Sequence, residues 1–184
     1  NACIAAEEFD NVYVVDSRNL STGHGHVVVE AALAAQRGMA AGEIVEYLKD
    51  LTGRVEASFV MDRLDYMVKG GRCSAVTMLG ANLLKLKPCI EVQEGKMGVV
   101  KKYRGSFEKC LREYVKDRLA ERTDLVHDRI FITYSSAPEE TVRMVREEIA
   151  KYADFSQVLE TRAGCTVCSH CGPNTLGILF IRSK

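Results

Sequence analysis

Three cysteines and a histidine near the end of the chain have types and spacing that suggest chemistry. Cys165, Cys168 and Cys171 stand at C-x-x-C-x-x-C spacing in GCTVCSHCGPNTLG, and His170 lies among them. Structural zinc takes four thiolate or imidazole ligands in a tetrahedron, and an iron–sulfur cluster takes four cysteines. The run supplies three local ligands and no C-x-x-C exists outside it, so a metal site needs a fourth ligand from elsewhere.

The same spacing also suits a redox-active pair of thiols. In thioredoxin-like proteins a C-x-x-C motif opens a helix directly after a strand, and the sequence does not predict that step here. Cys73, Cys89 and Cys110 stand alone in apolar surroundings, which is typical of small core residues. A zinc or iron site in an enzyme or redox role therefore stays open beside cysteines that only pack.

His170 directly precedes a turn, because Gly172, Pro173 and Asn174 follow it closely. A histidine held before a rigid turn can aim its ring into a cleft and donate a hydrogen bond to a carboxylate. A lone histidine is more often structural, so the pattern alone leaves both interpretations open.

A glycine pair precedes the first long apolar stretch. Gly23-x-Gly25 before a helix could bind a phosphate or carboxylate on free backbone N–H groups. It lacks the third glycine and the acidic partner of a dinucleotide site. A phosphate-binding enzyme is one alternative, and a tight strand-to-helix turn, with Ser21 or Thr22 capping the helix, is the structural explanation.

Charge is balanced over the whole chain. Lys plus Arg and Asp plus Glu number 25 each, so no net charge attracts nucleic acid or a membrane surface. Lys101, Lys102 and Arg104 form a local basic cluster at the end of an expected strand. A solvated strand edge explains this cluster by pattern alone.

Length and composition set the class of protein. The 184 residues, 47% of them hydrophobic, suffice for one domain or two small ones with a real core. No apolar run of about 18 residues and no signal peptide is visible, so we expect no stable membrane insertion. Seven cysteines, an odd number, favour free thiols and a cytoplasmic protein. The chain opens at Asn1 inside an apparent helix, so we expect that an N-terminal part is missing.

Apolar periodicity predicts strands and helices in alternation. Helices are predicted at 27–38, 42–51, 64–72, 107–122 and 138–153, and strands at 12–16, 57–62, 87–93, 97–105, 129–135, 158–162 and 176–182. The strands 87–93 and 97–105 form a hairpin around EGK. A boundary near Gly71 separates residues 1–71 from an α+β unit at 72–184.

With these pieces placed, the chain resembles the DegV family of bacterial fatty-acid-binding proteins. VVDSRNLSTGHGHVVVEAA is similar to the family's D-S-x-x-x-S-x-G-x-G segment, and SHCGPNTLGILF to its H-x-G-P-G-x-x-G segment. LDYMVKGGRCSAVTMLGANLLKLKPCIEV is similar to L-x-Y-L-x-x-G-G-R-I followed by L-L-x-I-K-P-I-L, and EGKMGVVKKYRG to the strand pair after it. The motifs occur in order over essentially the whole chain.

The resemblance implies an α/β fold with a DegV-like two-domain architecture. Residues 1–71 would be the C-terminal part of the first, truncated parallel-sheet domain, and 72–184 the second, α+β domain. It implies a non-catalytic lipid carrier that needs no cofactor and binds one long-chain fatty acid, with the tail in an apolar tunnel and the carboxylate between the domains. A fatty acid kinase is the implied partner, which converts the carboxylate to an acyl-phosphate for phospholipid synthesis.

The resemblance also implies roles for particular residues. His170 matches the histidine that holds the carboxylate, and its threonine and serine partners would precede Asn1. Arg104 is the best match to the basic residue that assists phosphotransfer or contacts the partner, and Arg72 is a second candidate.

The sequence departs from the family pattern at three positions. Asn174 replaces a glycine and can take the same left-handed geometry. Cys171 replaces a threonine and Cys73 an isoleucine, both with side chains of ordinary size for these positions. These replacements favour the interpretation that the cysteines pack, and do not form a metal site.

Overall fold

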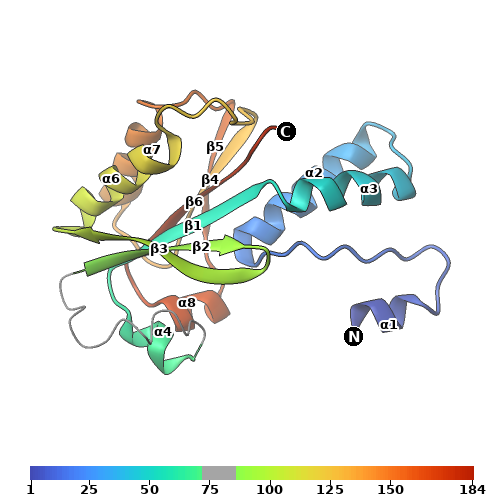
Figure 1. Ribbon diagram of the computed structural model, residues 1–184, viewed down its shortest axis with the longest axis horizontal. Helices are drawn as coiled ribbons and strands as arrows, with labels where there is room; N and C mark the ends of the chain where they lie inside the picture. The colour runs from blue at the N-terminus through green and yellow to red at the C-terminus, as the bar shows by residue number, and fades with distance from the viewer. Residues whose placement is uncertain (72–85) are drawn as a thin grey trace.

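The computed structural model describes residues 1–71 and 86–184, which form a mixed α/β fold (Figure 1). The helices are α1 (Ala2–Ala6), α2 (Ser21–Gln36), α3 (Ala41–Thr52), α4 (Asp65–Lys69), α6 (Phe107–Leu119), α7 (Glu139–Ile149) and α8 (Cys165–Cys171). The strands are β1 (Val55–Met61), β2 (Leu86–Gln93), β3 (Lys96–Arg104), β4 (Arg129–Tyr134), β5 (Gln157–Arg162) and β6 (Thr175–Ile181). No helix in these two ranges is both long and apolar enough to cross a bilayer.

The six strands form one sheet in the order β3-β2-β1-β6-β4-β5. The β4–β5 pair is parallel, because α7 carries the chain back to the edge at which β4 began, and the other neighbouring pairs are antiparallel. The hairpin of β2 and β3 turns at Glu94 and Gly95, which both have positive φ. β1 and β6 lie at the centre, and all seven residues of β6 are buried.

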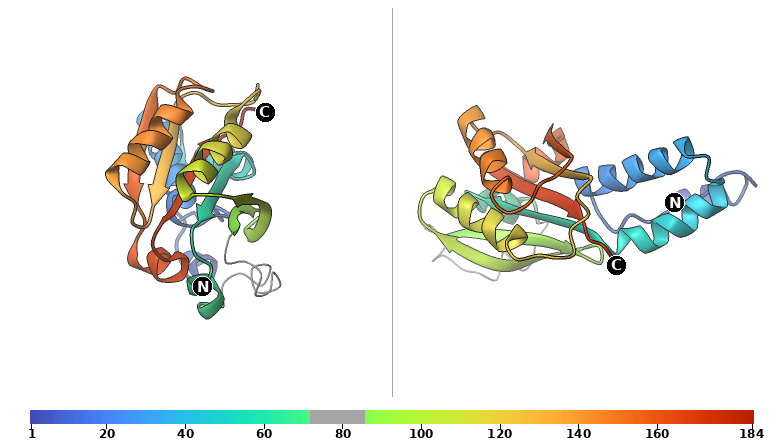
Figure 2. Two further views of the ribbon diagram at one scale, coloured as in Figure 1. Left: turned by 90° about the vertical axis from the view of Figure 1, so that its left-hand side faces the viewer. Right: turned by 90° about the horizontal axis from the view of Figure 1, so that it is seen from above.

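Helices α6 and α7 cover one face of the sheet (Figures 1 and 2). Their apolar stripes pack on side chains from alternate positions of β1, β4 and β6, which form the largest core cluster. Tyr114 of α6 ties the two central strands together in this core. Its hydroxyl donates to the Ser58 carbonyl at 2.8 Å and accepts from the Ile178 N–H at 2.9 Å, so this buried polar group is satisfied.

Among the described residues, the helices on the opposite face lie at its two ends. Helices α2 and α3 pack together at one end, around Val27, Leu48 and Leu51. Helices α4 and α8 pack together at the other end, around Met67 and Cys171. The middle of this face, between the two helix pairs, leaves room for a cavity.

The strand predicted at 12–16 is wrong. This segment is extended but forms no ladder, and Val12, Tyr13 and Val14 are 46%, 54% and 41% exposed. A strand needs a hydrogen-bonded neighbour, and no strand of the described sheet lies beside this run. The apolar composition of residues 12–16 could not show whether another strand lies beside them to form hydrogen bonds.

The helix predicted at 27–38 begins earlier than expected, at Ser21. Its N-cap is Leu20, and neither Ser21 nor Thr22 forms the predicted capping hydrogen bond. Gly23 and Gly25 consequently lie inside the helix, so the predicted tight turn between a strand and this helix is absent.

The remaining predicted helices and strands are confirmed within a few residues, except where they extend into 72–85. The predicted α/β class is confirmed, and the division into two domains at residue 71 stays a prediction. β1 precedes that boundary and pairs with β2 and β6, which follow it.

Candidate ligand-binding cavity

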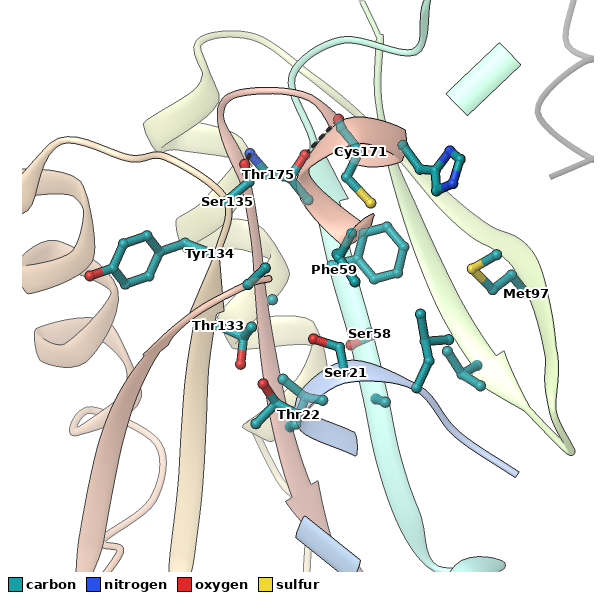
Figure 3. A pocket seen from close by; sticks show the side chains of 18 of the residues that line it. Ser21, Thr22, Ser58, Phe59, Met97, Thr133, Tyr134, Ser135, Cys171 and Thr175 are labelled. Atoms are coloured by element: carbon teal, nitrogen blue, oxygen red, sulfur yellow. Dashed lines mark hydrogen bonds between the residues drawn. The ribbon is translucent and has the colours of Figure 1, made fainter. Parts of the chain in front are cut away.

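A cavity of about 250 Å3 lies on the face of the sheet opposite α6 and α7 (Figure 3). It extends from the start of α2 to α8. Most of its lining is apolar, with hydroxyl groups at the α2 end and along β4, and it includes Leu20, Thr22, Ala57, Phe59, Met67, Val92, Met97, Thr133, Val167, His170, Cys171, Gly177 and Leu179. This mixture of apolar walls and few polar groups is typical of a small-molecule site.

The floor is made by β1 and β6. Because side chains alternate across a strand, Ala57 and Phe59 face the cavity, whereas Val60 faces the α6–α7 core. Gly177 of β6 contributes no side chain, and a Cβ there would lie 2.2 Å from the Ser58 carbonyl oxygen. The glycine therefore permits close pairing of the central strands and leaves space above them.

Hydroxyl groups near the floor bond mainly to one another and to the backbone. The Thr161 hydroxyl lies 3.2 Å from that of Thr22 and 2.8 Å from that of Thr133. Ser135 donates to the Gly172 carbonyl at 2.6 Å. Thr175 donates to the Cys171 carbonyl at 3.0 Å (Figure 3). With these bonds made, the floor presents chiefly carbon to a ligand.

Helix α8 forms one wall and is held against α4 by two glycines. A Cβ on Gly70 would lie 2.4 Å from Nδ1 of His170, and one on Gly172 would lie 2.4 Å from the Tyr66 ring. Gly172 has a φ of +74° and ends α8, which is a common role of glycine. These close approaches fix the position of the His170 ring.

His170 is half-buried and lines the cavity. Its ring forms no hydrogen bond with another residue of 1–71 or 86–184, although its Nδ1 edge packs on Gly70. A neutral or charged imidazole can donate from a ring nitrogen to a carboxylate oxygen. The cavity thus joins an apolar floor to one donor that is not used within the described fold.

A family model described as "uncharacterised protein, DegV family" matches residues 1–183. The chain belongs to the DegV family. A DegV domain-containing protein of Caldanaerobacter subterraneus is 29% identical over 189 residues, which cover 98% of this chain and 64% of that protein. The chain therefore spans less than two-thirds of the length of this curated relative.

Solved structures agree with this assignment of the DegV chain. A fatty-acid-binding DegV family protein from Thermus thermophilus superposes with a TM-score of 0.85 at 27% identity, over 98% of this chain and 65% of that one. A fatty acid binding DegV family protein from Streptococcus agalactiae gives a TM-score of 0.79 at 26% identity, over 99% and 64%. The predicted family resemblance is confirmed, and these structural neighbours bind fatty acids.

The cysteines of this DegV chain differ widely in exposure. Cys165 is exposed, Cys168 is half-buried and Cys171 is buried against the cavity, where burial raises the pKa of its thiol to about 11. Within the described ranges no three His, Cys, Asp or Glu side chains gather in a way that could hold a metal ion. The predicted alternative of a zinc or iron–sulfur site on these cysteines has no support in this part of the chain.

The alternative of an anion site on Gly23 and Gly25 finds no support, because N–H groups at the start of α2 are used within the helix. The N–H groups of Gly23 and His24 donate to the Leu20 carbonyl at 3.1 and 3.3 Å in the first turn of α2. Gly23 serves packing: a Cβ there would lie 2.0 Å from Oδ1 of Asn19, which lines the cavity.

Of the two arginines that the family resemblance implied, only Arg104 belongs to the described residues. Arg104 ends β3 with an exposed side chain and does not line the cavity. Arg72 lies outside the described residues, as does Cys73. Of the basic cluster, Lys101 pairs with Asp117 at 2.5 Å on the sheet surface. The predicted partner role of Arg104 stays a prediction.

The sequence analysis missed a buried polar cluster under α2. Glu30 pairs with Arg129, and Tyr47 donates to Glu30 at 2.6 Å. Burial opposes ionisation of Glu30, but the hydrogen bonds from Tyr47 and Arg129 outweigh it and lower the pKa of the carboxyl. Burial, together with the Arg129 charge, lowers the pKa of His26 to about 4. The signal in the sequence was Glu30, an acidic residue among the apolar residues of the predicted helix 27–38, and His26 was predicted to precede that helix.

Proposed function

We propose that this chain binds a long-chain fatty acid, with its tail in the cavity and its carboxylate held by His170. The observation that carries the proposal is an apolar cavity with one half-buried histidine on its wall whose ring nitrogens have no partner among the described residues. A carboxylate near low-dielectric walls must be paired or hydrogen-bonded, and His170 offers such a donor. Fatty-acid binding by two structural neighbours supports the same ligand class.

The two parts of the ligand would contribute differently. Each methylene of the tail removed from water contributes about 0.8 kcal/mol, so the tail supplies most of the affinity. A hydrogen bond to a charged group contributes roughly 1.5–3 kcal/mol, so the carboxylate chiefly supplies orientation and selectivity. A carrier needs affinity from the tail and orientation from the carboxylate, because the reactive end of the lipid must stay at a defined place.

The proposed role is that of a carrier, and not of an enzyme. We propose a fatty acid kinase as the partner that receives the carboxylate, with the exposed Arg104 as a contact and Arg72 as a second candidate. The match covers 64% of the length of the curated relative. The full set of groups that hold the carboxylate, and the surface that meets the kinase, are therefore part of the proposal.

Comparing a fatty acid with the matching fatty alcohol tests the role of His170. The wild-type chain should bind the acid more tightly, and His170→Ala should weaken acid binding roughly tenfold while changing alcohol binding little, since about 1.4 kcal/mol corresponds to tenfold. Fluorescent displacement with native mass spectrometry gives both affinities. An equal loss for acid and alcohol would assign His170 to packing alone.

A second substitution tests the position of the ring without removing it. Gly70→Ala would displace the His170 ring, because the new Cβ lies 2.4 Å from Nδ1, and should reproduce the selective loss. Gly71→Asn is the matched control, since Gly71 has a φ of +60° with no atom of the described residues within 4 Å of a new Cβ, and asparagine tolerates that geometry. Selectivity that survives Gly70→Ala would contradict the placement of the carboxylate at this ring.

A further inference from the structure

The first turn of α8 holds two of the cysteines in an arrangement that the sequence did not predict. α8 begins at Cys165, three residues after β5 ends at Arg162. The C-x-x-C pair therefore does open a helix directly after a strand, which corrects the expectation that it would not. A C-x-x-C pair that opens a helix after a strand shares this local feature with thioredoxin-like redox motifs, although β5, α8 and β6 do not form a parallel βαβ unit.

The helix geometry brings the two cysteines into bonding range. Residues three apart in an α-helix have Cα atoms about 5 Å apart, and disulfides form when this separation is about 4.4–6.8 Å. The Sγ of Cys168 donates to the Ala163 carbonyl at 3.2 Å, so this sulfur points toward the N-terminal end of the helix. Cys165 is the first residue at that end.

Exposure separates this pair from the other thiols of α8 and the core. Cys165 is exposed and Cys168 is half-buried, so a small reagent can reach both. Cys171, Cys89 and Cys110 are buried, and burial raises the thiol pKa of each. Reactivity needs an accessible thiolate, so the buried thiols are unsuited to exchange.

We propose that Cys165 and Cys168 form a reversible dithiol–disulfide pair that exchanges with small-molecule disulfides of the glutathione type. The thiolate of Cys165 attacks one sulfur of the oxidised reagent, releases one thiol and forms a mixed disulfide. The thiolate of Cys168 then attacks the Cys165 sulfur, closes the ring and releases the second thiol. The two cysteines lose two electrons and two protons, and the reagent gains them.

The disulfide would lie in the wall of the ligand cavity. Thr166 and Val167 stand between the two cysteines and line the cavity. A disulfide between Cys165 and Cys168 would fix the first turn of α8, which forms this part of the cavity wall. The proposal itself rests on the geometry of α8, and it holds whether or not the cavity takes a fatty acid.

Equilibration with mixtures of reduced and oxidised glutathione tests the pair. The parent protein for this test is the chain with Cys3→Ser and Cys73→Ser. These two changes remove an exposed thiol and one outside the described residues. After the free thiols are alkylated, intact mass should show two fewer alkylated thiols and no added glutathione under oxidising mixtures. The dithiol form should return under reducing mixtures, and circular dichroism verifies that each variant is folded.

Single replacements identify the partners. Cys165→Ser and Cys168→Ser should each abolish the internal disulfide and leave glutathione attached to the remaining cysteine. Cys171→Ser, the matched control at the same spacing, should oxidise as the parent does. A parent that stops at the mixed disulfide, or loss of the internal disulfide in Cys171→Ser, would overturn the proposal.

Discussion

His26 is fully buried beside Phe131, and neither ring nitrogen has a hydrogen-bond partner among the described residues. The charged groups that face it are Arg129 and Glu30, which pair with each other. An imidazole in this setting is held neutral, because a proton on it would be desolvated and would face the Arg129 charge. The cost of protonating His26 therefore appears as a dependence of stability on pH.

The His26 pKa of about 4 in the folded state lies below the unfolded value of 6.5. The unfolded chain then binds more protons between these values, so stability is complete above pH 6.5 and falls as the pH falls toward 4. We expect a loss of about 2 kcal/mol in the free energy of unfolding between pH 7 and pH 4.5, measured by urea denaturation. His26→Leu should remove most of this slope, and an unchanged slope would assign it to other groups.

The conformation of a single residue was predictable where backbone geometry determines it. The burial of a side chain, which depends on residues distant in the sequence, was not predictable. The left-handed conformation expected of Asn174 is observed, with a φ of +52°, because few residue types tolerate it. The burial of His26 was not predictable, since its neighbours Arg129 and Phe131 come from β4, about a hundred residues away. That His170 holds a carboxylate stays a prediction.

At the scale of elements, the pairing of β1 with β6 depends on Gly177. Phe59 faces Gly177 across this pair, and a Cβ on the glycine would lie 2.8 Å from the Phe59 Cβ and 2.2 Å from the Ser58 carbonyl. Backbone atoms cannot move aside as a flexible side chain can, so the two central strands would have to separate. The strain would fall on the middle of the sheet.

We expect Gly177→Ala to destabilise the fold by roughly 1–3 kcal/mol, the usual cost of overpacking. Gly25→Ala is the matched control, because Gly25 lies in α2 and, in the part of the chain that the structure describes, no atom lies within 4 Å of the new Cβ. It should be neutral or should stabilise the helix by up to about 1 kcal/mol. Urea midpoints compare the two, and a stable Gly177→Ala would mean that β6 can shift along β1 at little cost.

Elements with a clear apolar period were predicted, and those defined by their neighbours were not. The amphipathic helices α6 and α7 and the β2–β3 hairpin match their predicted ranges closely. Residues 12–16 have strand composition without a strand neighbour. α8 was missed because its seven residues, CTVCSHC, have weak helix propensity and depend on packing against α4.

At the scale of the whole molecule, the apolar floor predicts how affinity depends on the length of the tail. Saturated fatty acids of increasing length should bind about fourfold more tightly for each methylene, since about 0.8 kcal/mol is gained per group. The gain should stop at the length that fills the cavity. Displacement titrations with a series of acids measure the slope, and an affinity independent of length would contradict a tail in this cavity.

The strands and the helices were largely predictable, but the order of the strands was not. β1 and β6, more than a hundred residues apart, lie side by side at the centre, and no local pattern specifies that pairing. The cavity was inferred from the family resemblance alone. It depends on the space that the described helices leave on one face of the sheet between α2 and α8, which is a property of the assembled molecule.

The open face has a consequence for how sequences of this fold can diverge. Along β6, Leu176, Ile178 and Phe180 face the α6–α7 core, while Gly177 and Leu179 face the cavity. Neighbouring positions along β6 are therefore constrained by different surroundings, one by the packed core and the next by the shape of the cavity. Larger or smaller residues at Leu179 or Val92 can change the shape of the cavity while the α6–α7 core keeps its packing, so the cavity can diverge in a lineage without loss of the fold.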